Sequence, residues 1–412
     1  MMLVRSSHRR STVGRQLAIL GGEPAFKEPV HVGRPNVPDP EGFLNSISDI
    51  LERRWFTNQG PVVRKFEDRL TAFLGVKHVI AICNGTIALE LAERALELSG
   101  EVIVPSFTFV ATAHSLQWQG IRPVFCDIDP HSHCLDPDKV EQQITERTTA
   151  ILAVHLWGRP CQVEELEEIA SRRGLHLLFD AAHGFGCTYR GRMIGNSGDA
   201  EIFSFHATKF FNTFEGGAIA TNDDELAQRL RLMKNFGFSG MDRVDHVGTN
   251  GKMSEVSAAM GLAGLDSLAD FVSSNRINYM AYRRHLAELN GITMLQYDES
   301  ERCNYQYIVI EVDERDAGLT RDQLLAALRA ENVLARRYFW PGCHCMEPYR
   351  TLYPEAARAL PVTEHVASRV IVLPTGSAVG VEDVEIICGI IRRALEHPGA
   401  VAEAVGDAPY GV

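Results

Sequence analysis

The stretch Ala-Glu-Ile-Phe-Ser-Phe-His-Ala-Thr-Lys-Phe-Phe-Asn-Thr-Phe-Glu-Gly-Gly-Ala-Ile-Ala-Thr-Asn-Asp, residues 200–223, decides how the fold of this chain is interpreted. Its pattern predicts a strand over 200–205, a polar loop with a Gly-Gly pair, and a second strand over 218–221. Lys209 stands in the loop among the phenylalanines at positions 203, 205, 210, 211 and 214. Because burial disfavours the charged form of an amine, Lys209 is a candidate nucleophile. An ordinary surface lysine in a turn fits this stretch equally well.

Two upstream segments could serve such an amine. A lysine that holds pyridoxal phosphate (PLP) as a Schiff base needs an acid at the pyridine nitrogen and a cradle for the phosphate. The apolar strand 175–179 ends at Asp180, and open α/β sheets bind ligands at the carboxyl ends of their strands. Gly85 and Thr86 open an amphipathic helix after the strand 78–82, where free backbone N–H groups suit an anion. Together these segments predict a PLP site.

The order of the segments predicts the fold class. From residue 76 to residue 220, short apolar runs alternate with helical patterns, and the expected strands are 78–82, 101–104, 123–126, 150–154 and 175–179. Strands separated by helices form right-handed crossovers, and hence a mostly parallel sheet covered on both faces. We therefore expect a three-layered α/β fold with the site at one edge of the sheet.

Composition sets the domain organisation and excludes some partners. With 412 residues, 45% hydrophobic and 23% charged, the chain predicts a large domain over 17–265 and a smaller one over 266–397 that begins with a linking helix. Residues 1–16 are expected to form a disordered leader, with a transit peptide as the alternative, and 398–412 a disordered tail. No apolar run of 18 residues occurs, so no membrane span is expected. The net charge of −12 argues against nucleic acid as a partner.

Nine scattered cysteines, an odd number, suit reduced thiols in a cytoplasm better than a disulfide framework. Two short segments combine histidine with cysteine, at residues 131–134 and 343–345. Neither has the Cys-x2-Cys spacing of a zinc knuckle, so the sequence predicts no metal site.

Four motifs occur in order: Asn-Gly-Thr-Ile-Ala-Leu from residue 84, Pro-Ser-Phe-Thr-Phe-Val-Ala-Thr from 105, Asp-Ala-Ala-His from 180, and Ser-Phe-His-Ala-Thr-Lys…Glu-Gly-Gly-Ala from 204. Each is weak alone, but together they resemble the DegT/DnrJ/EryC1/StrS family of PLP-dependent sugar aminotransferases, from about residue 17 to about residue 395. The resemblance implies PLP-dependent transferase fold type I, with a smaller C-terminal α+β domain. It also implies a cytoplasmic homodimer with shared active sites that transfers an amino group from glutamate or glutamine to a keto-sugar nucleotide.

The resemblance assigns roles to cofactor-binding residues. Lys209 would hold PLP and move protons, and Asp180 would pair with the pyridine nitrogen. Further cofactor contacts are expected at Gly85, Thr86, Phe109, His183, Ser204 and Asn250. Phe109 would stack on the ring, with a core position as the alternative. His183 stands where the family commonly has glutamine, which leaves its contact with the ring hydroxyl open. Asn250 would reach the phosphate of the neighbouring subunit, or else form a plain turn before a helix.

Substrate contacts are expected at Thr57, Asn58, Lys252, Arg336, Arg337, Tyr338 and His344. A helix-entry turn explains Thr57 and Asn58 as well, and structural roles for the other residues stay open. The retained Lys209 favours amino transfer, because sugar dehydratases of the family carry histidine there. The motifs look more like members that aminate C4 of a dTDP-4-keto-6-deoxy sugar, with C3 of a dTDP-3-keto-6-deoxyhexose as the alternative.

Two other classes of protein remain open at this stage. A nicotinamide-dependent oxidoreductase would share the doubly wound sheet, but no Gly-x-Gly-x-x-Gly follows the first strand. A non-catalytic regulator on the same fold is the second alternative. An intact lysine, aspartate and phosphate cradle argue against it.

Overall fold

The computed structural model describes residues 15–356 and 359–406. Its centre is a seven-stranded sheet of order β2-β10-β9-β6-β5-β3-β4. The strands are β2 (His78–Ile82), β3 (Glu101–Pro105), β4 (Arg122–Cys126), β5 (Thr148–Val154), β6 (His176–Asp180), β9 (Ala200–Ser204) and β10 (Gly217–Thr221). Strand β10 is antiparallel to both neighbours, and the other pairings are parallel. The mostly parallel sheet expected from the sequence is confirmed.

Side chains that alternate along the strands divide the core into two layers. In β2, Ile80 and Ile82 join one apolar cluster, whereas Val79 and Ala81 join another. Helices α3 (Gly85–Ala95), α4 (Ala111–Trp118) and α7 (Asp224–Met233) cover the first face. Helices α2 (Pro61–Leu74), α5 (Pro137–Gln143), α6 (Val163–Arg173) and α8 (Glu255–Asp266) cover the second. Burying one such aliphatic side chain contributes about 1.5–3 kcal/mol, so the two layers fix the ends of the strands firmly.

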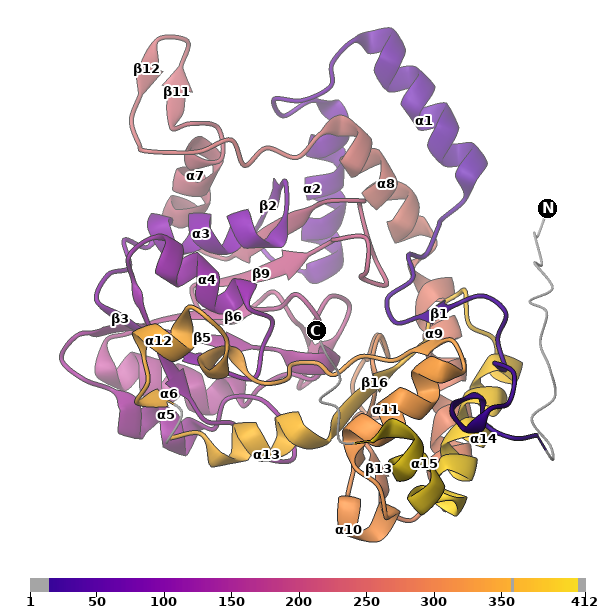
Figure 1. Cartoon of the computed structure of the whole chain (residues 1–412). Coiled ribbons are helices and arrows are strands. Elements are labelled where there is room, and N and C mark those ends of the chain that lie inside the picture. The colour runs from indigo at the N-terminus through magenta and orange to yellow at the C-terminus, as the bar shows by residue number, and fades with distance from the viewer. Residues whose placement is uncertain (1–14, 357–358, 407–412) are drawn as a thin grey trace.

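The smaller domain is built on an antiparallel sheet of three strands, β13 (Ile292–Met294), β14 (Ile308–Val312) and β16 (Val370–Leu373). Its helices are α9 (Leu268–Leu286), α10 (Glu314–Ala317), α11 (Arg321–Ala330), α12 (Tyr349–Leu352), α13 (Pro361–Arg369) and α14 (Val381–Glu396). The linking helix expected from residue 266 is α9, which begins after a break at Ser267. Figure 1 shows this domain beside the carboxyl-end side of the large sheet.

Both ends of the described chain depart from the expected domain boundaries. The sequence placed the first described residues in the large domain, but they belong with the smaller one. This segment forms η1 (Ala18–Leu20) and β1 (Val30–His31). Strand β1 pairs with β15 (Val333–Leu334), and Leu17 joins the small-domain core. The tail expected to be disordered forms α15 (Pro398–Val405), because Pro398 suits a first helical turn and Val401 is fully buried. The predictions for residues 1–14 and 407–412 lie outside the described residues.

Several elements project from the body. Helix α1 (Pro40–Arg53) and the hairpin of β11 (Phe238–Gly240) and β12 (Arg243–Val244) stand out at the same end of the molecule (Figure 1). Both carry exposed apolar side chains: Leu44 and Leu51 on α1, and Phe238, Met241 and Val244 on the hairpin.

The remaining elements are short. They are the hairpin β7–β8 (Thr188–Tyr189 and Arg192–Met193) and the helices η2 (Leu156–Gly158) and η3 (Cys343–Cys345). Among the helices of the described residues, none has both the length and the apolar character to cross a bilayer.

Candidate active site

A cavity of about 600 Å³ opens at the carboxyl ends of the parallel strands. The large domain lines it with the start of α3, the ends of β6 and β9, and the loop after β9. The smaller domain contributes Tyr307, Arg336, Tyr338 and Phe339. The site thus lies where the sequence places it, at one edge of the sheet, and the second domain forms its other wall.

Most of the predicted cofactor residues line this one cavity. They are Gly85, Thr86, Phe109, Asp180, His183, Ser204 and Lys209, and of the predicted substrate contacts Arg336 and Tyr338 join them. Phe109 is 58% exposed, so its ring is open to the cavity and does not fill the core. The remaining predicted contacts, all in the described part of the chain, lie outside this lining: Thr57, Asn58, Asn250, Lys252, Arg337 and His344.

The loop that carries Lys209 is rigidly supported from behind. Phe205 donates its N–H to Gly216 O at 2.8 Å and accepts from Thr213 N at 2.9 Å, which closes the loop at its base. The ring of Phe211 lies 5.0 Å from that of Phe205 and 4.6 Å from that of Phe185. Most of the neighbouring phenylalanines therefore form a core beneath the loop, whereas the sequence suggested that they surround the amine.

Burial in the cavity changes the pKa of the Lys209 amine. Lys209 Nζ lies 3.4 Å from Tyr307 Oη, its hydrogen-bond acceptor. Loss of hydration lowers the pKa of Lys209 to about 8, and the negative charge of Asp180 opposes this shift. At mildly alkaline pH, from about 8 upward, a substantial fraction of the side chains therefore carries a free amine, the form that attacks a carbonyl carbon.

Asp180 is a carboxylate held in a fixed orientation. Its side chain ends β6 and is 6% exposed. One oxygen accepts the N–H of Ala182 at 3.0 Å, and the other accepts the hydroxyl of Thr112 at 2.8 Å. Burial raises the pKa of Asp180, whereas these two hydrogen bonds and the charge of Lys209 lower it. A carboxylate buried in this way stabilises a positive charge placed against it in the cavity.

His183 is held in one tautomer. The backbone N–H of Trp157 donates to Nδ1 at 3.3 Å, so Nε2 carries the proton and donates to Tyr307 Oη at 2.9 Å. Burial lowers the pKa of His183 well below its usual range, so the ring is neutral. Trp157 adopts a left-handed backbone with φ of 62°, a strained conformation of the kind found at functional sites. Since Tyr307 Oη accepts from both His183 and Lys209, its own hydrogen is available to the cavity.

The start of α3 forms a compact anion cradle with the end of β9. Asn84 caps the helix by accepting the N–H of Ile87 at 2.8 Å, and the N–H groups of Gly85 and Thr86 have no partner within the helix. A Cβ placed on Gly85 would lie 3.0 Å from Cβ of Ser204, so glycine permits the close approach of the two segments. Backbone donors and a serine hydroxyl therefore meet at a helix N-terminus, an arrangement suited to phosphate.

Two predicted substrate contacts and one cofactor contact lie near a separate basic cavity. Asn58 and Lys252 line a space of about 150 Å³ with Arg231, Lys234 and others. The Lys252 ammonium lies 4.5 Å from the ring centre of Phe236. Asn250 is exposed, and its backbone bridges to that of Asn235 beside this cavity. Thr57 is likewise exposed, and its carbonyl accepts the indole N–H of Trp55 at 2.7 Å.

Two further contacts expected from the sequence have different surroundings. Arg337 pairs with Asp322 at 3.2 Å and stacks over the ring of Trp340 at 4.3 Å, so its guanidinium is already engaged. The His344 side chain is fully buried, with Nδ1 at 2.6 Å from Ser106 Oγ. Neither side chain lines the cavity, contrary to the expectation that they contact substrate.

Sequence reasoning missed the residues that orient the predicted ones. Tyr307 belongs to the second domain, 98 positions after Lys209, and no motif marks it. Trp157 acts through its backbone, which side-chain patterns do not reveal. Thr112 could have been identified from the sequence, because it is the last residue of the motif that begins at residue 105.

These residues fit PLP. The cavity brings together an amine of lowered pKa, an oriented carboxylate and a helix N-terminus with a serine, which are the three groups that the cofactor requires. The fold and the site therefore define a PLP-dependent transferase of fold type I.

The family model of the "DegT/DnrJ/EryC1/StrS aminotransferase family" matches residues 39–392. The chain belongs to this family, and it is a transaminase.

Relatives and solved structures agree with this assignment. The chain is 39% identical to a dTDP-4-amino-4,6-dideoxy-D-glucose transaminase of Shigella dysenteriae, over 89% of this chain and all of the relative. It is 35% identical to a GDP-perosamine synthase of Caulobacter vibrioides, over 85% of this chain and 94% of the relative. A crystal structure of DesI in the presence of its TDP-sugar product superposes with a TM-score of 0.89 at 47% identity, covering 93% of this chain and 97% of that one.

Proposed function

We propose that this aminotransferase moves an amino group from glutamate to C4 of a dTDP-4-keto-6-deoxy sugar. The observation that carries the proposal is the single cavity lined by both Lys209 and Asp180, beside an anion cradle at the start of α3. Support for the sugar comes from the Shigella dysenteriae relative, named for a 4-amino sugar of dTDP, and from DesI, whose structure was determined with a TDP-sugar product. Glutamate is the donor that the family resemblance suggests.

Lys209 supplies the mobile proton in this proposal. PLP, when bound, forms a covalent bond to an amine and withdraws electrons from the carbon that carries it. Nζ of Lys209 removes the proton from the α-carbon of the amino donor and, in the second half-reaction, delivers a proton to C4 of the sugar. Because its pKa is about 8, the side chain can accept and release a proton near neutral pH. Tyr307 Oη, fixed by His183, holds the amine in position.

Asp180 supplies the electrostatic stabilisation. With PLP bound, its carboxylate would pair with the protonated pyridine nitrogen and would thereby keep the ring electron-withdrawing. The hydroxyl of Thr112 and the N–H of Ala182 orient the carboxylate before substrate arrives, so little reorganisation is needed during the reaction.

A homodimer would complete the site. Helix α1 and the β11–β12 hairpin expose apolar side chains at one end of the molecule, where a second copy could cover them. The basic cavity of Asn58, Arg231 and Lys252 lies in this region, outside the lining of its own active-site cavity. We place Asn250 and Lys252 at the partner's active site, Asn250 toward the cofactor phosphate and Lys252 toward the anionic nucleotide.

The test is to incubate the purified protein with PLP, glutamate labelled with ¹⁵N and a panel of dTDP- and UDP-linked ketosugars. We expect ¹⁵N in the product of the dTDP-4-keto-6-deoxy sugar, bonded to C4 by NMR. Nitrogen at C3 of a 3-keto sugar would overturn the regiochemistry, and label from glutamine carrying ¹⁵N on its α-amino group but not from glutamate would overturn the donor. Failure with every sugar, although glutamate converts the bound PLP to its amine form, would overturn the substrate class.

A further inference from the structure

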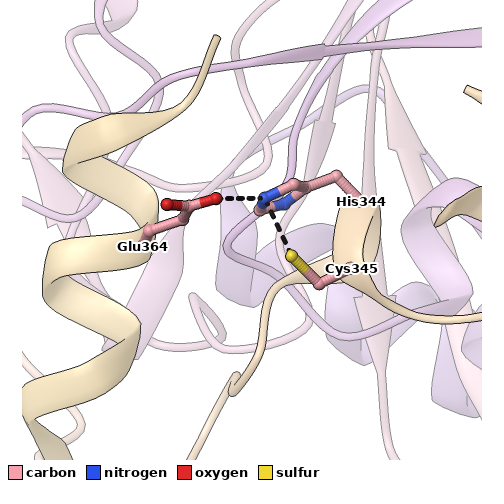
Figure 2. A group of neighbouring side chains, drawn as sticks. All are labelled: His344, Cys345 and Glu364. Carbon is pink, nitrogen blue, oxygen red and sulfur yellow. Dashed lines mark hydrogen bonds and ion pairs between the residues drawn. The ribbon is translucent and has the colours of Figure 1, made fainter. Parts of the chain in front are cut away.

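Three side chains that can bind metal ions meet beside the active site. His344 and Cys345 belong to η3 and Glu364 to α13, and Figure 2 shows all three converging. His344 Nε2 lies 3.1 Å from Cys345 Sγ and 3.4 Å from Glu364 Oε1. One ligand atom from each residue lies within 4.8 Å of the other two. The His344 side chain is fully buried, whereas that of Glu364 is 49% exposed, so an ion in solution can reach the cluster.

The cluster does not have the geometry of a catalytic relay. In a nucleophile–histidine–carboxylate relay the acid binds one ring nitrogen and the nucleophile the other. Here the thiol and the carboxylate both face Nε2, and a single N–H cannot align well with both. A cation placed between the three atoms would accept an electron pair from each of them.

The other ring nitrogen is oriented as a metal-bound histidine requires. Nδ1 lies 2.6 Å from Ser106 Oγ, which also accepts the backbone N–H of His344 at 3.0 Å. A hydroxyl oxygen has two lone pairs, so it can accept Nδ1–H as well, and this leaves a lone pair on Nε2. Such an outer hydrogen bond fixes the ring of metal-binding histidines in general.

The ligand types and spacings indicate the class of ion. Imidazole, thiolate and carboxylate together suit Zn²⁺, whereas Mg²⁺ and Ca²⁺ prefer oxygen ligands alone. Tetrahedral bonds of about 2.0–2.3 Å set neighbouring ligand atoms about 3.3–3.6 Å apart. The observed 3.1 and 3.4 Å are close to this spacing, and the remaining pair, Cys345 Sγ and a Glu364 carboxylate oxygen, lies within 4.8 Å.

We propose that His344, Cys345 and Glu364 bind one Zn²⁺-type divalent cation, with water as the fourth ligand and with release of the Cys345 thiol proton. The sequence did not predict this metal site, because the spacing at 343–345 is not that of a zinc knuckle and because the third ligand comes from α13. Cys343 is not a ligand, since its Sγ points to Thr108 O at 3.5 Å. The ion would tie η3 to α13 and thereby restrain the preceding Tyr338 and Phe339, which line the active-site cavity.

Cobalt(II) is the probe for this site. The holoenzyme is stripped with a chelator and titrated with Co²⁺, whose bond to a thiolate gives a charge-transfer band together with visible d–d bands. We expect one equivalent per chain by elemental analysis, and displacement by Zn²⁺. Cys345→Ser should remove the charge-transfer band, and Glu364→Gln should weaken binding at least about tenfold. Ser106→Ala should weaken binding about 10–100-fold, the range for outer-shell partners.

Two matched variants control for other ligands. Cys303→Ser removes a different partly exposed thiol. Glu347→Gln removes an exposed carboxylate two positions after Cys345. Both should bind Co²⁺ like the wild type, and circular dichroism should show all variants folded. Binding unchanged by Cys345→Ser, or cobalt held by PLP in every variant, would overturn the proposal. Absence of a stoichiometric site in the wild type would also overturn it and leave the cluster as a hydrogen-bonded contact.

Discussion

Replacing Lys209 with methionine should stabilise the cofactor-free protein at pH 7 and stabilise it much less at pH 10. Burial lowers the pKa of this lysine from 10.5 to about 8, so at pH 7 the folded state must hold an ammonium that is better hydrated in the unfolded chain. Methionine has a similar length and no charge. It therefore removes this cost, apart from the modest contribution of the hydrogen bond to Tyr307.

The magnitude follows from linkage. The fall of the Lys209 pKa from 10.5 in the unfolded chain to about 8 in the folded one corresponds to about 3 kcal/mol below pH 8. Between the folded and unfolded pKa values the unfolded chain binds more protons, so the stability of the wild type rises with pH through this window. The advantage of Lys209→Met should then fall to about 1 kcal/mol at pH 10.

Urea unfolding of both proteins at pH 7 and pH 10, followed by circular dichroism, measures the difference in free energy of unfolding. Lys65→Met serves as a control, because Lys65 lies exposed on α2 and its loss should not produce this pH-dependent gap. If the gap between Lys209→Met and the wild type were the same at both pH values, the claim that the amine is dehydrated in the cavity would be refuted.

Three further substitutions test the rest of the site. Asp180→Asn keeps the shape but loses the charge, so kcat should fall about 10²–10³-fold with PLP still bound, and an unchanged kcat would contradict the electrostatic role. Tyr307→Phe removes the hydroxyl that contacts Lys209, so kcat should fall about tenfold with KM for glutamate unchanged; a change in KM alone would argue for a substrate contact. Gly85→Val crowds Ser204, so Kd for PLP should rise about tenfold by fluorescence titration, and an unaltered Kd would place the phosphate elsewhere.

The sequence predicted the large domain well because its signals are local. Each strand of the large sheet is a mostly apolar run of five to seven residues, and the polar groups that end the parallel strands must meet at one edge of the sheet. Asp180 and Lys209 could therefore be placed in one site before any coordinates were known. Gly85 and Ser204 could be added from the motifs.

Long-range packing accounts for what the sequence did not predict. Tyr307 reaches the amine only because the second domain closes over the sheet edge, and no local pattern encodes that approach. The segment of α15 was expected to be a disordered tail, yet Val401 packs against the small-domain core and stabilises the segment as a helix. His344 was expected at the substrate because its segment resembles the substrate-facing loop of the family. Arg336 and Tyr338 do line the cavity, but the turn of the chain at η3 directs His344 inward to Ser106.

The central claim is that the side-chain amine of residue 209 is the one that bonds PLP. Borohydride reduction of the purified enzyme followed by peptide mass spectrometry tests it directly. We predict a stable pyridoxyl-phosphate adduct on the peptide that contains Lys209 and on no other lysine peptide. An adduct on Lys252 or on any other lysine in place of Lys209, or no adduct on a protein that still transfers nitrogen, would contradict the account.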